Sequence, residues 1–208
     1  MVSLPYVIVV AGCLLLFIVI NLDNVLRYRA SRSTASAKPQ IEKRIAIPLS
    51  LAGVGTIAFF LESFLYVVLG YSENMALIFA SLDLARIDLL ESFGLLVMVL
   101  GYAIFCWSVI VRGRYATSWQ MPVDQKLVNW GPYRYVRHPS YLGYFLMFIG
   151  FLLTWHNVLV MIPLIAIPGY VLLTFREEEM LKAKFGDEYV RYQKRVGRFL
   201  PKVPRKPR

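Results

Sequence analysis

The chain has 208 residues, of which 58% are hydrophobic and 17% are charged, and its mean hydropathy is +0.55. Soluble domains have about 45–50% apolar and about 25% charged residues, so this composition excludes an ordinary water-soluble enzyme. The formal net charge is +10, but most basic residues flank apolar segments, where they bear on membrane topology rather than on nucleic-acid binding. We expect an all-α, multi-pass membrane protein that contacts membrane lipids and no nucleic acid.

Five apolar segments are candidates for transmembrane helices, namely residues 4–22, 45–71, 89–111, 141–154 and 158–175. A helix rises 1.5 Å per residue and the hydrocarbon core is about 30 Å thick, so a crossing needs about 20 residues. The fourth segment has 14 residues and reaches only about 21 Å. The first segment is followed by charges without a small-residue cleavage site, so we expect it to be retained as a helix.

The fourth and fifth segments are separated only by residues 155–157, which predicts a tight antiparallel helical hairpin. Pro163 and the pair Pro168-Gly169 interrupt the fifth segment, and they predict a kinked or broken helix whose irregular backbone lines a cavity. Beyond the membrane we expect two short helices, the first over residues 177–185 and the second over residues 187–196. Gly186 ends the first, and the apolar stripe of the second predicts that it packs on another element.

The distribution of basic residues predicts the topology. Of the 23 Lys and Arg residues, 22 lie in residues 27–44, 112–137 and 176–208. By the positive-inside rule these three regions are cytoplasmic, which places the N-terminus outside and the C-terminus inside. Chemistry in the aqueous phase is then expected in the cytoplasmic segments, residues 112–140 and 176–208.

Several kinds of site are not supported by the sequence. His138 and His156 are the only histidines and are predicted on opposite sides of the membrane, so we expect no metal centre. No glycine-rich dinucleotide motif follows a strand pattern, and Gly53 and Gly55 fall in the second span, where small residues let helices approach each other. Cys13 and Cys106 lie in apolar runs and are expected to be free thiols.

The first candidate site lies where the fourth segment begins, in residues 131–143 (GPYRYVRHPSYLG). Tyr133, His138 and Tyr141 gather there, and Pro139 fits the first helical turn. The free N–H groups of that turn, at the positive end of the helix dipole, suit a carboxylate or a phosphate. Alternatively, these residues are an interfacial aromatic belt with basic anchors and no chemical role.

The second candidate site is the run of Arg176 and residues 177–179, three glutamates in an otherwise basic region. One buried carboxylate could bind an ammonium group or hydroxyls, or the run could be a solvated face that balances Lys182 and Lys184. Taken together, the two clusters suit a ligand that is both cationic and zwitterionic, such as S-adenosylmethionine, although other adenine-bearing ligands fit as well.

The order and spacing of these motifs resemble a known family. Residues 125–201 resemble the isoprenylcysteine carboxyl methyltransferase family and the related membrane phospholipid methyltransferases. The matching motifs are KLV at 126–128, GPY at 131–133, RHPSYLG at 137–143, EEE at 177–179 and FGDEY at 185–189, followed by Tyr192, Val196 and Pro201. We expect a single membrane domain over residues 1–208. Three N-terminal helices would lie in residues 1–111, and a cofactor-binding loop, the hairpin and a cytoplasmic tail in residues 112–208, without a Rossmann domain.

The resemblance also implies an S-adenosylmethionine site and its residues. By motif position these are Gln125, Lys126, Leu127, Val128, Tyr133, His138, Pro139, Ser140, Tyr141 and Glu178, with Glu177 and Glu179 as alternatives for the last. Arg176 would position the acceptor carboxylate. The implied reaction is carboxyl methylation of a prenylcysteine or similar lipophilic acceptor that enters from the bilayer, without a metal.

Three alternatives remain open at this point. A phospholipid N-methyltransferase would need a base, supplied by His138 or a glutamate. A nicotinamide-dependent membrane lipid reductase could use a similar C-terminal cofactor arrangement. A non-enzymatic transporter or scaffold is favoured by the prolines of the fifth segment and by Glu62, an ionisable residue inside the second span.

Overall fold

The computed structural model describes residues 4–33, 43–69, 88–115, 126–156 and 158–202. Its main helices are α1 (Leu4–Ser33), α2 (Lys43–Leu69), α3 (Asp88–Arg112), α4 (Pro139–Thr154) and α5 (Ala166–Arg195). Short 3-10 helices are η2 (Gly113–Tyr115), η3 (Gly131–Arg134) and η4 (Val158–Ile165). No strand occurs in the described ranges, apart from an isolated bridge between Val136 and Gly197. The expected all-α fold is confirmed.

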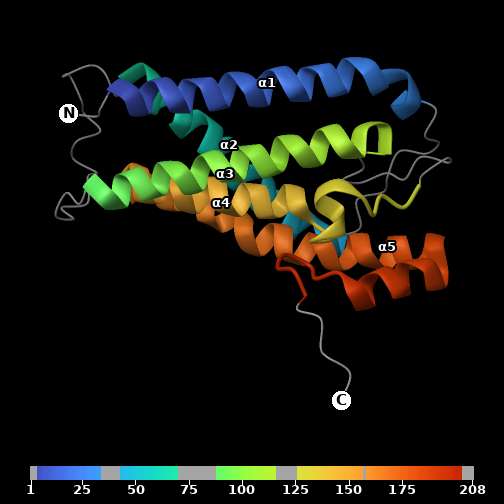
Figure 1. The fold of residues 1–208 in the computed structure, drawn as a ribbon. Helices are drawn as coiled ribbons and strands as arrows, with labels where there is room; N and C mark the ends of the chain where they lie inside the picture. The colour runs from blue at the N-terminus through green and yellow to red at the C-terminus, as the bar shows by residue number, and fades with distance from the viewer. Residues whose placement is uncertain (1–3, 34–42, 70–87, 116–125, 157, 203–208) are drawn as a thin grey trace.

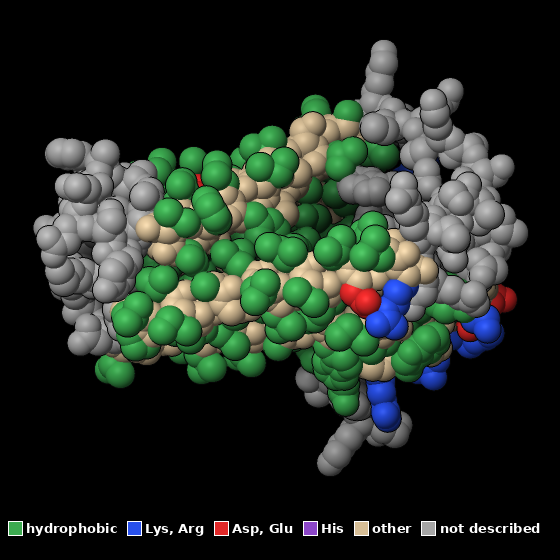
Figure 2. All heavy atoms as spheres, turned by 90° about the horizontal axis from the view of Figure 1, so that it is seen from above, with side chains coloured by type: hydrophobic (Ala, Val, Ile, Leu, Met, Phe, Trp, Pro, Cys, Tyr) green, Lys and Arg blue, Asp and Glu red, His purple; other side chains and the backbone are tan. Residues whose placement is uncertain are grey.

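The helices form a bundle suited to a bilayer (Figure 1). Within the described ranges, four segments are long and apolar enough to cross a membrane, namely α1, α2, α3 and the continuous η4–α5 segment, while α4 is shorter at 16 residues. In Figure 2, apolar side chains cover the visible helices along their length, and most of the visible charged side chains gather at one end. The protein is an integral membrane protein.

Two helix boundaries differ from the expected ones. The first helix continues past residue 22 to Ser33, and Arg27 pairs with Asp23 at 2.6 Å on this extension. The separate helix expected to start at residue 177 is wrong, because α5 runs from Ala166 out of the apolar region without a break there. The expected interruptions at Pro163 and Gly186 are confirmed: η4 carries Pro163, and Gly186 has φ of 51° within α5. The interruption expected at Pro168 and Gly169 is wrong, because both lie near the start of α5 with helical geometry.

As the expected hairpin requires, α4 contacts η4, and the Tyr141 and Tyr144 rings of α4 stack on Tyr170 of α5. The most extensive backbone contacts of these helices are nevertheless made with other helices. The backbone of α4 packs along α3, and η4 and α5 pack along α2. Glycines set these pairs: a Cβ on Gly101 of α3 would lie 2.7 Å from the Gly143 carbonyl oxygen of α4, and a Cβ on Gly55 of α2 would lie 2.7 Å from Ala166. The close approach expected in the second span is therefore found at Gly55. Gly169 also packs closely on α2 rather than lining a cavity.

A second, smaller apolar cluster fixes the end of α5. Tyr189, Tyr192 and Val196 are buried together against Leu127 and Phe185. This confirms that the apolar stripe of the terminal helix packs on another element, which includes the segment before η3. The end of α5 is thereby held at the same end of the bundle as the start of α4.

Candidate functional site

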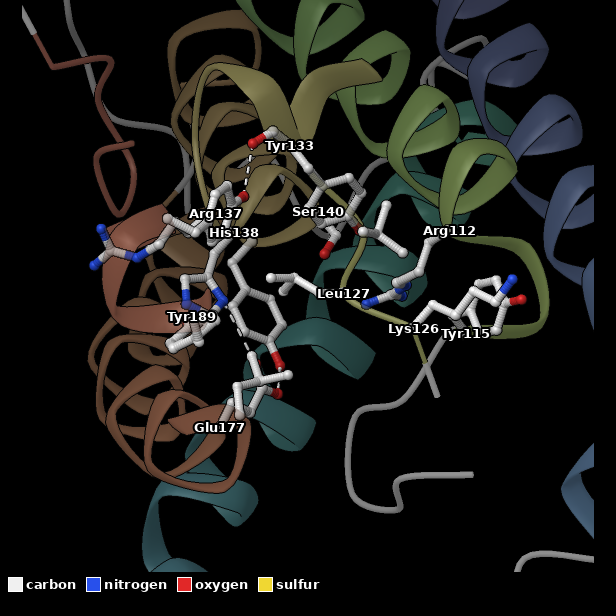
Figure 3. A pocket seen from close by; sticks show the side chains of 14 residues that line it. Arg112, Tyr115, Lys126, Leu127, Tyr133, Arg137, His138, Ser140, Glu177 and Tyr189 are labelled. Carbon is white, nitrogen blue, oxygen red and sulfur yellow. Dashed lines mark hydrogen bonds and ion pairs between the residues drawn. The ribbon is translucent and has the colours of Figure 1, made fainter. Parts of the chain in front are cut away.

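A pocket lies where α3 ends, α4 begins and α5 leaves the bundle (Figure 3). Its empty space is about 590 Å³ when the part open to solvent is counted. Its lining residues are Arg112, Tyr115, Lys126, Leu127, Val128, Tyr133, Arg137, His138, Ser140, Tyr141, Glu177, Leu181, Tyr189 and Tyr192.

The tail after α5 ties down the loop that forms one wall of the pocket. The backbone N–H of Arg137 donates to the Gly197 carbonyl at 2.8 Å, and that of His138 donates to the Arg198 carbonyl at 3.1 Å. The Tyr192 hydroxyl donates to the Tyr133 carbonyl at 2.6 Å. These bonds join segments about 60 residues apart in the sequence and fix the turn from which α4 begins.

Glu178 is the centre of a buried ion-pair network beside the pocket. Its carboxylate accepts hydrogen bonds from Arg137 at 2.9 and 3.0 Å, from Arg198 at 2.9 and 3.1 Å, and from the Gln193 amide at 2.8 Å. The Arg198 guanidinium also lies 4.0 Å from the centre of the Phe175 ring. A buried carboxylate requires such compensation, so Glu178 links the loop, α5 and the tail.

His138 is held between two glutamates. Its Nδ1 lies 3.5 Å from Glu177 Oε2, and its Nε2 lies 3.1 Å from Glu178 Oε1. Burial by itself would lower the pKa of the His138 imidazole, but the hydrogen bonds and charges of the two carboxylates outweigh burial and raise it above its ordinary value. When the imidazole is protonated, both ring nitrogens can donate to these carboxylates.

Tyrosines and Glu177 form another part of the pocket wall. The Tyr141 hydroxyl donates to Glu177 Oε1, and the Tyr141 ring stacks on Tyr170 with centroids 4.6 Å apart. Burial raises the pKa of the Tyr133 phenol although the charge of Arg112 lowers it, so this hydroxyl stays protonated. Glu177 thus presents a carboxylate to the pocket, with its position set by Tyr141 and His138.

Arg112 lines the pocket, although in the sequence it counts only among the basic residues that predict the membrane topology. It is the last residue of α3, and Figure 3 shows its side chain on the pocket wall across from Glu177. Its Nε is buried and has no hydrogen-bond partner among the described residues. An arginine at the end of an apolar helix has the pattern of an interfacial anchor, and no signal in the sequence distinguishes the two roles.

The structure gathers most of the residues expected to bind the cofactor. Seven of them line the pocket: Lys126, Leu127, Val128, Tyr133, His138, Ser140 and Tyr141. Pro139 is buried as the first residue of α4, and Gln125 lies outside the described residues. Of the three glutamates, Glu177 lines the pocket and Glu178 does not. Their roles in binding remain predictions.

Arg176, expected to position the acceptor carboxylate, does not line the pocket. Its guanidinium forms an ion pair with Glu179 at 3.1 Å, and both side chains are substantially exposed. Arg112 is the arginine of the pocket wall whose guanidinium is not already held by Glu178. The structure thus offers a second candidate for this task.

Other candidates from the sequence lie away from the pocket. Glu62 is buried in α2, with Oε2 unpartnered within the described ranges. His156 follows the far end of α4, where its Nδ1 is 3.9 Å from Glu91. No group of three or more metal-ligating side chains occurs among the described residues.

The fold and the pocket define a class: an α-helical membrane protein with a polar, tyrosine-rich ligand pocket at one end of its bundle. Residues 90–188, which include α3, α4 and most of the pocket, match the family described as phospholipid methyltransferase. The chain is 31% identical over 129 residues to a protein-S-isoprenylcysteine O-methyltransferase of Tribolium castaneum, covering 57% of this chain and 44% of that protein.

Two further relatives carry similar names. The protein-S-isoprenylcysteine O-methyltransferase B of Arabidopsis thaliana is 31% identical over 125 residues, covering 55% of this chain and 60% of that protein. A protein-S-isoprenylcysteine O-methyltransferase of Schizosaccharomyces pombe is 35% identical over 83 residues, which is 35% of its length. The matches thus span about a third to three fifths of these relatives. Over these parts the chain is similar to the isoprenylcysteine carboxyl methyltransferases and to the phospholipid methyltransferase family, the same families that its motifs resemble.

Proposed function

We propose that the protein is an S-adenosylmethionine-dependent methyltransferase that methylates the carboxylate of a lipophilic acceptor, most like a prenylcysteine. The names of the relatives support the reaction class. We infer the acceptor from the pocket residues, because the relatives are matched over only part of their length.

The pocket residues fit the chemical groups of this methyl donor. When bound, S-adenosylmethionine supplies a methyl group activated by a positive sulfur. Glu177 is placed to accept hydrogen bonds from an ammonium group or from ribose hydroxyls. The faces of Tyr133 and Tyr141 stabilise a nearby positive charge, and Leu127 and Val128 offer apolar contact. The side chains that surround the pocket also exclude water from the reacting groups.

The surroundings of His138 favour one of the two possible acceptors. A carboxylate is already ionised at neutral pH, whereas a phospholipid ammonium must lose a proton before it can attack. With Glu177 and Glu178 on its two ring nitrogens, His138 is a poor base and a good positioning group for Glu177. This arrangement favours an acid acceptor, for which orientation and desolvation suffice.

The alternative acceptor is a phospholipid amine. The match of residues 90–188 to the phospholipid methyltransferase family favours it, and Glu177 would then have to take up the proton. The two acceptors differ in their product, since a carboxyl methyl ester is labile to base and a methylated amine is not.

We also propose the orientation that the basic residues predict. The N-terminus would lie outside, and the C-terminus and the pocket would lie at the cytoplasmic face, where the loop 126–138 and the end of α5 meet. The lipid chain of the acceptor would enter from the bilayer between helices, with its polar head at the pocket.

The test is calorimetric binding of S-adenosylmethionine and S-adenosylhomocysteine to the full chain in detergent. We expect micromolar binding by the wild type and at least a tenfold loss in Glu177→Gln. Tyr135→Phe is the matched control, because Tyr135 is exposed and does not line the pocket. If the folded wild type binds neither compound at millimolar concentration, the methyltransferase assignment fails, and reduced nicotinamide cofactors are the next ligands to test.

A further inference from the structure

We infer that Arg112 anchors a ligand carboxylate in the pocket. This inference rests on the proposed function for the identity of the ligands. Two of them carry a carboxylate: the amino-acid part of the methyl donor, and the acceptor. The shared chemistry is an ion pair between a buried guanidinium and a carboxylate.

The first observation is that the Arg112 side chain has a buried donor, Nε, without a partner among the described residues. Leaving such a charged donor unpaired is costly, because burial removes the water that would otherwise solvate it. A ligand with an anionic oxygen would remove that cost on binding.

The second observation is that the nearest charge of opposite sign is already engaged. Glu177 is the carboxylate whose charge acts on Arg112. Glu177 receives the Tyr141 hydroxyl and faces His138, and no ion pair with Arg112 forms among the described residues. The guanidinium therefore stands on one wall and the carboxylate on another, separated by the pocket.

This separation matches a zwitterion. An α-amino acid carries an ammonium group and a carboxylate on one carbon, so Glu177 and Arg112 could hold its two charges at once. Lys126 also lines the pocket and adds positive potential there. The arrangement suits the amino-acid part of the donor or, if Glu177 takes the ribose, the acceptor carboxylate.

The other arginines near the pocket are occupied. Arg137 is bound to Glu178 and to the backbone of Gln193 and Val196. Arg176 pairs with Glu179 outside the pocket lining. Arg112 is thus the arginine placed to meet a ligand.

The experiment compares ligands with and without a carboxylate on wild type, Arg112→Gln and Arg112→Lys. The donor-side probes are S-adenosylhomocysteine and 5′-methylthioadenosine, which lacks the amino-acid part. The acceptor-side probes are N-acetyl-S-farnesylcysteine and its amide. Arg134→Gln is the control, because Arg134 is exposed and does not line the pocket.

If Arg112 holds the donor, Arg112→Gln lowers affinity for S-adenosylhomocysteine 10- to 100-fold, in line with the usual strength of charged hydrogen bonds, and leaves 5′-methylthioadenosine unchanged. If Arg112 holds the acceptor, the farnesylcysteine acid loses the same factor and its amide does not. Unchanged 5′-methylthioadenosine binding also shows that the variant is folded, and Arg112→Lys should retain part of the affinity.

Equal affinities of the wild type and Arg112→Gln for both acids would overturn the inference while leaving the proposed function in place. A folded wild type that binds none of the four probes would defeat the proposed function, and the inference with it.

Discussion

Adjacent residues in this protein perform different tasks. Glu177 and Glu178 are chemically identical neighbours, but successive positions on a helix point about 100° apart. Glu177 therefore faces the pocket and Tyr141, whereas Glu178 meets Arg137 and Arg198. The run of three glutamates indicates a site without showing which carboxylate serves it, since the answer depends on how α5 is rotated against the loop and the tail.

Replacing Glu178 should reduce stability more than replacing Glu177. In Glu178→Gln, the buried Arg137 loses its counter-ion, and breaking a buried ion pair typically costs about 3–5 kcal/mol. We expect Glu177→Gln to lower the free energy of unfolding by less than Glu178→Gln does, because the Glu177 side chain is more exposed and forms no ion pair with an arginine among the described residues. Chemical denaturation in detergent checks this difference. Equal stability of the two variants would show that the Glu178 network does not hold the site together.

The pH dependence of stability should reveal that His138 is held between the carboxylates of Glu177 and Glu178. The folded protein raises the pKa of this imidazole above the ordinary value of 6.5, so the folded state binds the proton more tightly than the unfolded state. The stabilisation is full below pH 6.5 and is lost as the pH rises through the folded pKa. Melting temperatures of wild type and His138→Gln should therefore converge as the pH rises. A difference in melting temperature between the two proteins that widens as the pH rises would contradict this stabilisation of His138 by the two carboxylates.

At the scale of elements, the glycines decide which helices pair. The sequence predicts that α4 and the following helix are neighbours, because the connection is short. It does not reveal that Gly101 and Gly143 bring the backbones of α3 and α4 together, because any of several small residues could have made such a contact. The breaks at Pro163 and Gly186 were predictable, since each follows from the backbone chemistry of that one residue.

Gly101→Ala should destabilise the bundle, whereas Gly53→Ala should not. The new Cβ at position 101 would lie 2.7 Å from the Gly143 carbonyl oxygen, whereas one at position 53 has nothing within 4 Å. Overpacking of this kind costs about 1–3 kcal/mol, and alanine at an open helix position is favourable by about 0.5–1 kcal/mol. Thermal unfolding in the same detergent compares the two variants. An equal effect of both substitutions would contradict the α3–α4 pairing.

At the scale of the whole molecule, the fold and much of the site follow from local patterns. Hydropathy predicts the membrane spans, and the motifs over residues 125–201 predict seven of the residues that line the pocket. The placements of Arg112 and Arg176 could not be predicted, because both lie at the ends of apolar runs and their directions depend on the tertiary packing. Arg112 comes from α3 and precedes the motif region over residues 125–201 in the sequence.

The pocket, with His138 held between Glu177 and Glu178, predicts a reaction that needs no base. The most direct test is transfer of labelled methyl groups from S-adenosylmethionine by the purified full chain, with N-acetyl-S-farnesylcysteine and phosphatidylethanolamine offered in parallel. Our account predicts label on the farnesylcysteine, released as methanol by mild base. Base-stable label on the phospholipid, or no transfer to either acceptor by protein that binds the donor, would contradict it.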